Sequence, residues 1–268
     1  MPTAFVRGHE LYYERSGSGE PLLAVMGMSG THLSWGEPFL DALRRDFEVV
    51  VYDHRGIGNS SPAQAGYTIA DLADDAAGLL DELGWSTAHV LGISMGGMVA
   101  QELALRHPER VRTLALGCTY CGGEGASRTS PAVYERLSAS WMAGDREAAL
   151  RTGWEANVSA RFAADDEQYA TFRERALRVP ANLPAIFAQI QAIGGHDTSE
   201  RLSQITAPAL VVHGTDDEML PSSNAEMIAA RIPAARLEIF DGVGHLFFWE
   251  EPERSAALVR ELALGARV

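Results

Sequence analysis

The sequence predicts an α/β fold, in which a mostly parallel, doubly wound sheet carries helices on both faces. From about residue 20 onward, short apolar runs alternate with helical patterns. Such alternation is typical of parallel strands that are joined by crossover helices. It stops between residues 120 and 196 and then resumes. We therefore expect a core of residues 1–119 and 197–268 with an inserted helical unit of residues 120–196.

The elements of the core are expected in a regular order. An antiparallel edge hairpin is predicted around Gly8 and His9. Strands and helices then alternate, with strands at 22–25, 48–52, 89–92 and 111–117, and helices at 35–45, 69–83 and 95–106. After the insertion the alternation resumes over 199–205, 209–213, 222–232, 236–240 and 252–264.

The inserted unit reads as helical throughout. Helical patterns cover residues 131–143, 146–156, 166–177 and 185–193, with a proline-rich break over 180–184. The unit contains large aromatic side chains that either face a ligand or pack the unit onto the core; these are Trp141, Trp154, Phe162, Tyr169, Phe172 and Phe187. Packing is the simpler explanation for most of them.

The motif Gly92-Ile93-Ser94-Met95-Gly96 follows a predicted strand and precedes a predicted helix. A serine at the apex of so tight a turn is exposed and strained, and the flanking glycines remove side chains that would clash. The backbone N–H of Met95 begins the helix, where it can stabilise an oxyanion. Because Gly-Ser turns are common, the motif needs partners to indicate catalysis.

A histidine and a choice of acids follow later in the chain. Asp216, Asp217 and Glu218 come directly after the strand at 209–213, and His245 follows the strand at 236–240. A nucleophilic serine needs a histidine to take its proton and an acid to orient that histidine. The residues alone leave the choice among the three acids open.

With these motifs the chain resembles the alpha/beta-hydrolase superfamily, in particular its serine esterases and lactonases, such as 3-oxoadipate enol-lactonase, and its cofactor-free haloperoxidases. The resemblance implies the alpha/beta-hydrolase fold with a helical cap inserted after the sixth strand. In that family the acid usually lies three residues after the strand-ending glycine and four before a proline, a spacing that Gly214, Asp217 and Pro221 match. It therefore favours Asp217, with Asp216 as the alternative.

Two further segments match the family. Residues 22–30 resemble its oxyanion loop, in which Met28 takes the position of the backbone N–H donor. Met26 replaces the usual histidine of that loop, so the polar contacts of that histidine are expected to be missing. Residues 53–60 match the D-x-R-G-x-G-x-S turn of the family, which is expected to be structural.

The substrate pocket is expected between the cap and these loops. Met26, Met28, Met95 and Met98 gather around the serine, which favours an apolar pocket because methionine is flexible and polarisable. The residues expected to line the pocket are Gly27, His32, Trp141, Phe187, Met219 and Leu246.

Composition excludes several classes of function. The net charge of −14, from 36 acids against 22 bases, argues against nucleic acid as a partner. All the bases are arginines, which rules out a Schiff base, a P-loop lysine and a Ser-Lys dyad. No histidines or carboxylates have metal-ligand spacing, and Cys118 with Cys121 is expected to be structural. Without a leader or an apolar run of membrane length, we expect a cytoplasmic protein with no membrane partner.

The predicted function is hydrolysis of a small-molecule ester or lactone without a cofactor or metal. His245, oriented by Asp217, is expected to deprotonate Ser94, while the N–H groups of Met28 and Met95 hold the oxyanion. The same residues would also serve a cofactor-free perhydrolase or a carbon–carbon bond hydrolase. A non-catalytic binding protein of this fold is disfavoured because all three triad positions are occupied. The sequence leaves homo-oligomerisation open.

Overall fold

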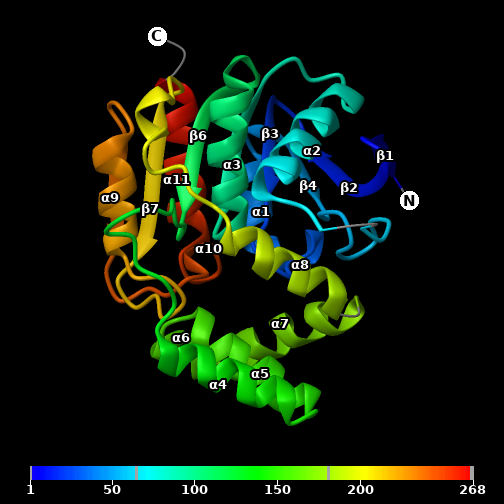
Figure 1. Ribbon diagram of the computed structural model, residues 1–268, viewed down its shortest axis with the longest axis vertical. Helices are drawn as coiled ribbons and strands as arrows, with labels where there is room; N and C mark the ends of the chain where they lie inside the picture. Colours follow the sequence, from blue (N-terminus) through cyan, green and yellow to red (C-terminus); the bar gives the residue numbers. More distant parts are fainter. Residues whose placement is uncertain (1, 64–65, 180–181, 266–268) are drawn as a thin grey trace.

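A computed structural model describes residues 2–63, 66–179 and 182–265. Its sheet has eight strands in the order β1-β2-β4-β3-β5-β6-β7-β8 (Figure 1). The strands are β1 (Thr3–Val6), β2 (His9–Gly17), β3 (Glu20–Val25), β4 (Phe47–Tyr52), β5 (Ala88–Ile93), β6 (Val111–Gly117), β7 (Ala209–Gly214) and β8 (Arg236–Phe240). Strand β2 pairs antiparallel with β1 and β4, and the other pairs are parallel. The predicted fold class is confirmed.

Helices cover both faces of the sheet, so its central strands are buried on both sides. Every residue of β5 and β7 is buried, which explains their continuous apolar sequences. One apolar cluster joins the sheet to α2, α3 and α9, and a second joins it to α1, α10 and α11. These helices are α1 (Glu37–Arg44), α2 (Ile69–Glu82), α3 (Met95–Arg106), α9 (Ser223–Arg231), α10 (Phe247–Glu250) and α11 (Pro252–Gly265).

Between β6 and β7 the chain forms the helical cap, which Figure 1 shows at one end of the molecule, beyond the strand ends. Its helices are α4 (Pro131–Met142), α5 (Arg146–Asn157), α6 (Ala160–Ala163), α7 (Asp166–Arg178) and α8 (Leu183–Gly194). Each begins after a polar residue whose side chain accepts a hydrogen bond from the first turn. The predicted break over 180–184 lies partly outside the described residues, and the domain boundaries at 119/120 and 196/197 stay predictions.

An aromatic cluster fastens the cap to the core. Trp154 of α5 is fully buried, and its ring packs against those of Phe162, Phe172 and Trp249. The Trp249 indole also donates to the Ser34 carbonyl at 2.8 Å. Tyr169 also packs on Trp154, so packing accounts for four of the six aromatic side chains of the inserted unit, Trp154, Phe162, Tyr169 and Phe172.

Two predicted elements differ in the structure. The helix expected over 35–45 is split into a 3₁₀ turn, His32–Trp35, and α1, because Gly36 has φ 73° between them. The segment 199–205 contains only a 3₁₀ turn, Leu202–Gln204. No helix in the described part of the chain combines the length and the apolar character needed to cross a membrane.

Candidate active site

Ser94 lies at the apex of a strained turn between β5 and α3. Its backbone has φ 56° and ψ −122°, a conformation that costs a non-glycine residue about 1–3 kcal/mol. A Cβ at Gly92 would lie 2.3 Å from the Gly96 carbonyl oxygen, and one at Gly96 would lie 2.0 Å from that of Val25. Only glycine therefore fits two residues before and two residues after Ser94.

The backbone of Ser94 forms hydrogen bonds with the end of β6 and with Thr119, two residues after it. Its N–H donates to the Gly117 carbonyl at 2.9 Å, and the Thr119 hydroxyl donates to the Ser94 carbonyl at 2.6 Å. The next residue, Met95, is the first of α3, and its N–H has no acceptor among the described residues. A free N–H at a helix N-terminus attracts negative charge.

Asp217 forms the centre of a hydrogen-bond network at the carboxyl end of β7. Its Oδ2 accepts from His245 Nδ1 at 2.7 Å and lies 2.9 Å from His213 Nε2. Its Oδ1 accepts from the N–H groups of Met219 and Leu220 at 2.8 and 2.9 Å. Burial alone would raise the pKa of Asp217, but the two histidines outweigh it and hold the pKa below its ordinary value. The carboxylate is therefore ionised at neutral pH.

The other two adjacent acids point elsewhere. Asp216 is exposed and accepts from the Thr215 hydroxyl at 3.1 Å. Glu218 pairs with Arg136 of the cap. Of the three acids, Asp217 alone contacts His245 in the described structure.

His213, which is not among the predicted site residues, shares the acid with His245. It is fully buried at the end of β7, and its Nε2 lies 2.9 Å from both the Leu220 carbonyl oxygen and Asp217 Oδ2. Both neighbours accept hydrogen bonds, so Nε2 must carry the proton. His213 therefore restrains the rotation of the Asp217 carboxylate.

Cys118 also lies beside the acid. Its Sγ, a carboxylate oxygen of Asp217 and a ring nitrogen of His245 all lie within 4.8 Å of one another. Burial, and then the charge of Asp217, raise the pKa of the Cys118 thiol well above its usual value, and burial raises that of Cys121 to about 11. Neither thiol is ionised at neutral pH, so both cysteines act as packing groups.

The loop that carries His245 is held by Glu250 and by the cap. Glu250 accepts from the N–H groups of Gly244 and Ser159, each at 2.8 Å, and from the Ser159 hydroxyl. A Cβ at Gly244 would lie 2.6 Å from the backbone of Val158, so the cap touches this loop directly. No local sequence pattern indicated this role of Glu250.

The oxyanion loop has supports that replace the missing histidine. His54 donates from Nε2 to the Met26 carbonyl at 3.0 Å. A Cβ at Gly30 would lie 2.5 Å from Met26 Cγ, so the methionine side chain fills the space beneath the loop. A Cβ at Gly27 would lie 3.1 Å from that of Ser94, which places this loop against the serine.

Two of the predicted pocket residues, Met219 and Leu246, lie beside the acid and the histidine, and two others, Trp141 and Phe187, lie on the cap. The N–H groups of Met219 and Leu246 bond to Asp217 and to Asn157, beside the acid and the histidine. Trp141 and Phe187 project from the cap, with exposed fractions of 47% and 64%.

His32 has polar neighbours at both ring nitrogens. Its Nδ1 lies 3.0 Å from both carboxylate oxygens of Asp53, its Nε2 lies 3.6 Å from Glu14, and its ring packs on Tyr12. The ring nitrogens thus face the buried Asp53 and the half-exposed Glu14. A role for His32 in the pocket stays a prediction.

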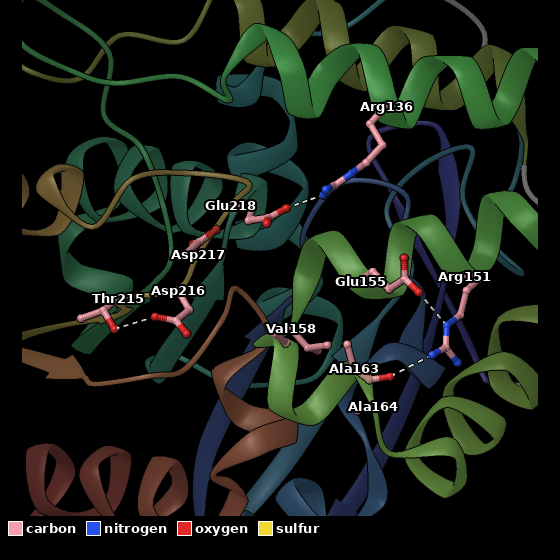
Figure 2. A pocket seen from close by; sticks show the side chains of 11 residues that line it. Arg136, Arg151, Glu155, Val158, Ala163, Ala164, Thr215, Asp216, Asp217 and Glu218 are labelled. Atoms are coloured by element: carbon pink, nitrogen blue, oxygen red, sulfur yellow. Dashed lines mark hydrogen bonds and ion pairs between the residues drawn. The ribbon is translucent and has the colours of Figure 1, made fainter.

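A cleft of about 670 Å³ opens between the cap and the acid loop, as Figure 2 shows. Its walls come from α4, α5 and α6 on one side and from residues 215–218 on the other. Asp217 lines the cleft, but Ser94 and His245 do not. The Arg136–Glu218 ion pair spans it (Figure 2).

Comparisons with known proteins agree with this architecture. Residues 20–252 match the family model described as alpha/beta hydrolase fold. A relative from Azorhizobium caulinodans, named "Putative carbamate hydrolase RutD", is 32% identical and covers 99% of this chain and 97% of its own.

Two solved structures are also similar over nearly the full length. One, described as "Est816 as an N-Acyl homoserine lactone degrading enzyme", is 31% identical with a TM-score of 0.78 and covers 97% of this chain and 99% of its own. The enol-lactonase from Burkholderia xenovorans LB400 is 26% identical with a TM-score of 0.84 and covers 98% and 100%. The chain is a hydrolase that belongs to the alpha/beta hydrolase family.

Proposed function

We propose that the protein cleaves carboxylic esters or lactones through an acyl-enzyme formed on Ser94. The observation that carries the proposal is the 2.7 Å contact between His245 Nδ1 and a buried, ionised Asp217. An acceptor on Nδ1 fixes the imidazole tautomer that leaves Nε2 free to take a proton. The strained turn at Ser94, which follows β5, supplies the hydroxyl.

The reaction follows from these groups. His245 Nε2 removes the proton of the Ser94 hydroxyl as Oγ attacks the carbonyl carbon. The N–H groups of Met28 and Met95, which have no acceptor among the described residues, donate to the resulting oxyanion. His245 then gives its proton to the leaving alkoxide, and water activated by the same base releases the acid. No step needs a metal or a cofactor.

The acyl or alkyl group of the substrate is proposed to be apolar. Support comes from Trp141 and Phe187, whose rings are exposed on the cap. Three of the four methionines expected around the serine are buried in the core: Met26, Met95 and Met98 are 0–3% exposed. Met28 is the one of the four that is more than slightly exposed.

Hydrolysis of a carbamate is a second candidate, favoured by the 32% identity to a full-length relative with that name. The same triad would attack the carbamate carbonyl. Nitrogen donation makes that carbonyl less electrophilic than an ester, so the oxyanion donors would have to supply more of the stabilisation.

A substrate panel tests the proposal. Purified protein is assayed with p-nitrophenyl esters of two to twelve acyl carbons, with γ-butyrolactone and an N-acyl homoserine lactone, and with an aryl carbamate. We expect kcat/KM to rise with acyl length among the esters and turnover of at least one lactone. A Ser94→Ala protein serves as the control. Carbamate turnover above every ester and lactone would favour the second candidate, and equal rates in wild type and Ser94→Ala would exclude both.

A further inference from the structure

A buried side chain of the cap, that of Gln189 on α8, contacts the oxyanion loop. This side chain is 0% exposed, and its Oε1 accepts from the Ser29 N–H at 2.8 Å. An N–H can only donate, so the amide oxygen must face Ser29 and the amide nitrogen must face away. That nitrogen has no partner among the described residues.

Ser29 needs such a contact because its backbone is strained. Its φ of 59° lies in the left-handed region, which a residue other than glycine rarely adopts. Such a conformation persists only where the surroundings hold it. The turn bond from the Gly30 N–H to the Gly27 carbonyl is long, at 3.3 Å. The Gln189 contact is shorter than this turn bond and than the 3.0 Å bond from His54 to the Met26 carbonyl of the same loop.

The strained residue is next to the proposed oxyanion donor. The Ser29 N–H belongs to the peptide that follows Met28, and the Met28 N–H belongs to the peptide before it. Rotation at Ser29 would therefore change where Met28 points. Deleting or displacing an oxyanion donor is costly, since such donors act only when aimed at the developing charge.

The helix that carries Gln189 is anchored to the core. Asn182, which caps α8, donates to the Gly56 carbonyl at 2.9 Å. A Cβ at Gly56 would lie 2.9 Å from that of Ala185, so the first turn of α8 lies directly on the core. About one turn of helix therefore separates Ala185, on the core, from Gln189, which bonds to the oxyanion loop.

We propose that Gln189 is a positioning residue through which the cap sets the geometry of the oxyanion hole; this inference rests on the proposed function. A methionine would fill the same volume without leaving an amide nitrogen unpaired, so packing alone does not account for glutamine here. The bond to Ser29 does account for it. Movement of α8 away from the core would break this bond and lower the reactivity of Ser94 without touching the triad.

The test compares Gln189→Met with Gln191→Met, the same change at an exposed position of the same helix. Both are assayed with p-nitrophenyl butyrate, and their affinity for phenylethylboronic acid is measured. That boronic acid forms a tetrahedral adduct with a serine and so resembles the oxyanion. Turnover is expressed per site titrated to completion with a p-nitrophenyl phosphonate, so that unfolded protein does not count.

For Gln189→Met we expect kcat to fall about 10- to 100-fold, with KM changed less than about threefold and boronate affinity lowered in parallel with kcat. Gln191→Met should match the wild type. A Gln189→Met protein with wild-type kcat and boronate affinity per titrated site would overturn the inference. So would a rise in KM alone, which would indicate a substrate-binding role. Wild-type protein that neither hydrolyses esters nor takes up phosphonate would instead reject the proposed function.

Discussion

Replacing Asp217 by asparagine tests whether Asp217, rather than an adjacent acid, orients His245. The carboxylate receives hydrogen bonds from His245, His213 and two backbone N–H groups. An asparagine offers one accepting oxygen and one donating NH₂ group in place of two oxygens. If its oxygen keeps the two backbone N–H groups, its NH₂ group faces His245 Nδ1. The imidazole must then carry its proton on Nε2, where it can no longer accept the proton of Ser94.

The expected loss is about 10⁴-fold in kcat, which corresponds to about 5–6 kcal/mol of transition-state stabilisation. Initial rates with p-nitrophenyl butyrate measure it, and thermal unfolding shows whether the variant is folded. Asp216→Asn is the matched control, because Asp216 is exposed and its carboxylate accepts only from the Thr215 hydroxyl in the described structure. We expect it to stay within about twofold of wild type. A crippled Asp216→Asn protein beside an Asp217→Asn protein that keeps a tenth of the activity would refute this assignment.

Three further predictions concern the loop, the pH and the chemistry. Glu250→Ala leaves the Gly244 N–H, the Ser159 N–H and the Ser159 hydroxyl without their acceptor, so we expect about 1–3 kcal/mol lower stability and at least about tenfold lower kcat; unchanged denaturant midpoint and kcat would exclude this role. Burial lowers the pKa of His196 from 6.5 to about 4 in the folded protein. As the pH drops from 6.5 to 4, His196 is therefore protonated in the unfolded chain but not in the folded one, and the free energy of unfolding falls. The fall amounts to at most about 3 kcal/mol, and His196→Asn should remove it; equal pH slopes of unfolding free energy in both proteins would contradict this. Peroxide-dependent bromination in acetate should be weak beside ester hydrolysis, because Met28-Ser29-Gly30 lacks the proline of the perhydrolases that the motif resembles; a bromination rate above that of every ester would reverse the order.

The features that could be predicted from the sequence are those that leave a pattern within a short stretch of the chain. The alternation of strands and helices predicted the order of the elements. Each strand or helix can be recognised from its own apolar pattern and from the glycine or polar residues at its ends. The turn at Ser94 was predictable from its own five residues, although the structure shows that Gly96 also clears space for the Val25 carbonyl of β3. Gly214 likewise marks the place where β7 passes within contact of Val243.

The residues that hold these groups in place could not be predicted in this way. Glu250 joins the His245 loop to Ser159 of the cap, and Gln189 lies 160 positions from Ser29, whereas His213 lies only four residues before Asp217. None has a spacing that marks its role. The loss of the usual histidine at Met26 was visible in the sequence, but its replacement by His54 depends on how β3 and β4 pair. The surroundings of His32 could not be predicted because its neighbours in space, Asp53 after β4 and Glu14 in β2, are distant in sequence.

Covalent labelling of Ser94 tests the central claim most directly. A p-nitrophenyl phosphonate transfers its phosphonyl group to an activated serine and releases p-nitrophenol, and intact-mass and peptide mass spectrometry locate the adduct. We predict one adduct per chain, on the peptide that contains Ser94, with ester hydrolysis lost in proportion to labelling. Ser94→Ala should fold, take up no label and lose about 10⁴- to 10⁶-fold in kcat. Undiminished hydrolysis by a fully labelled protein, or a label on any other residue, would contradict the account.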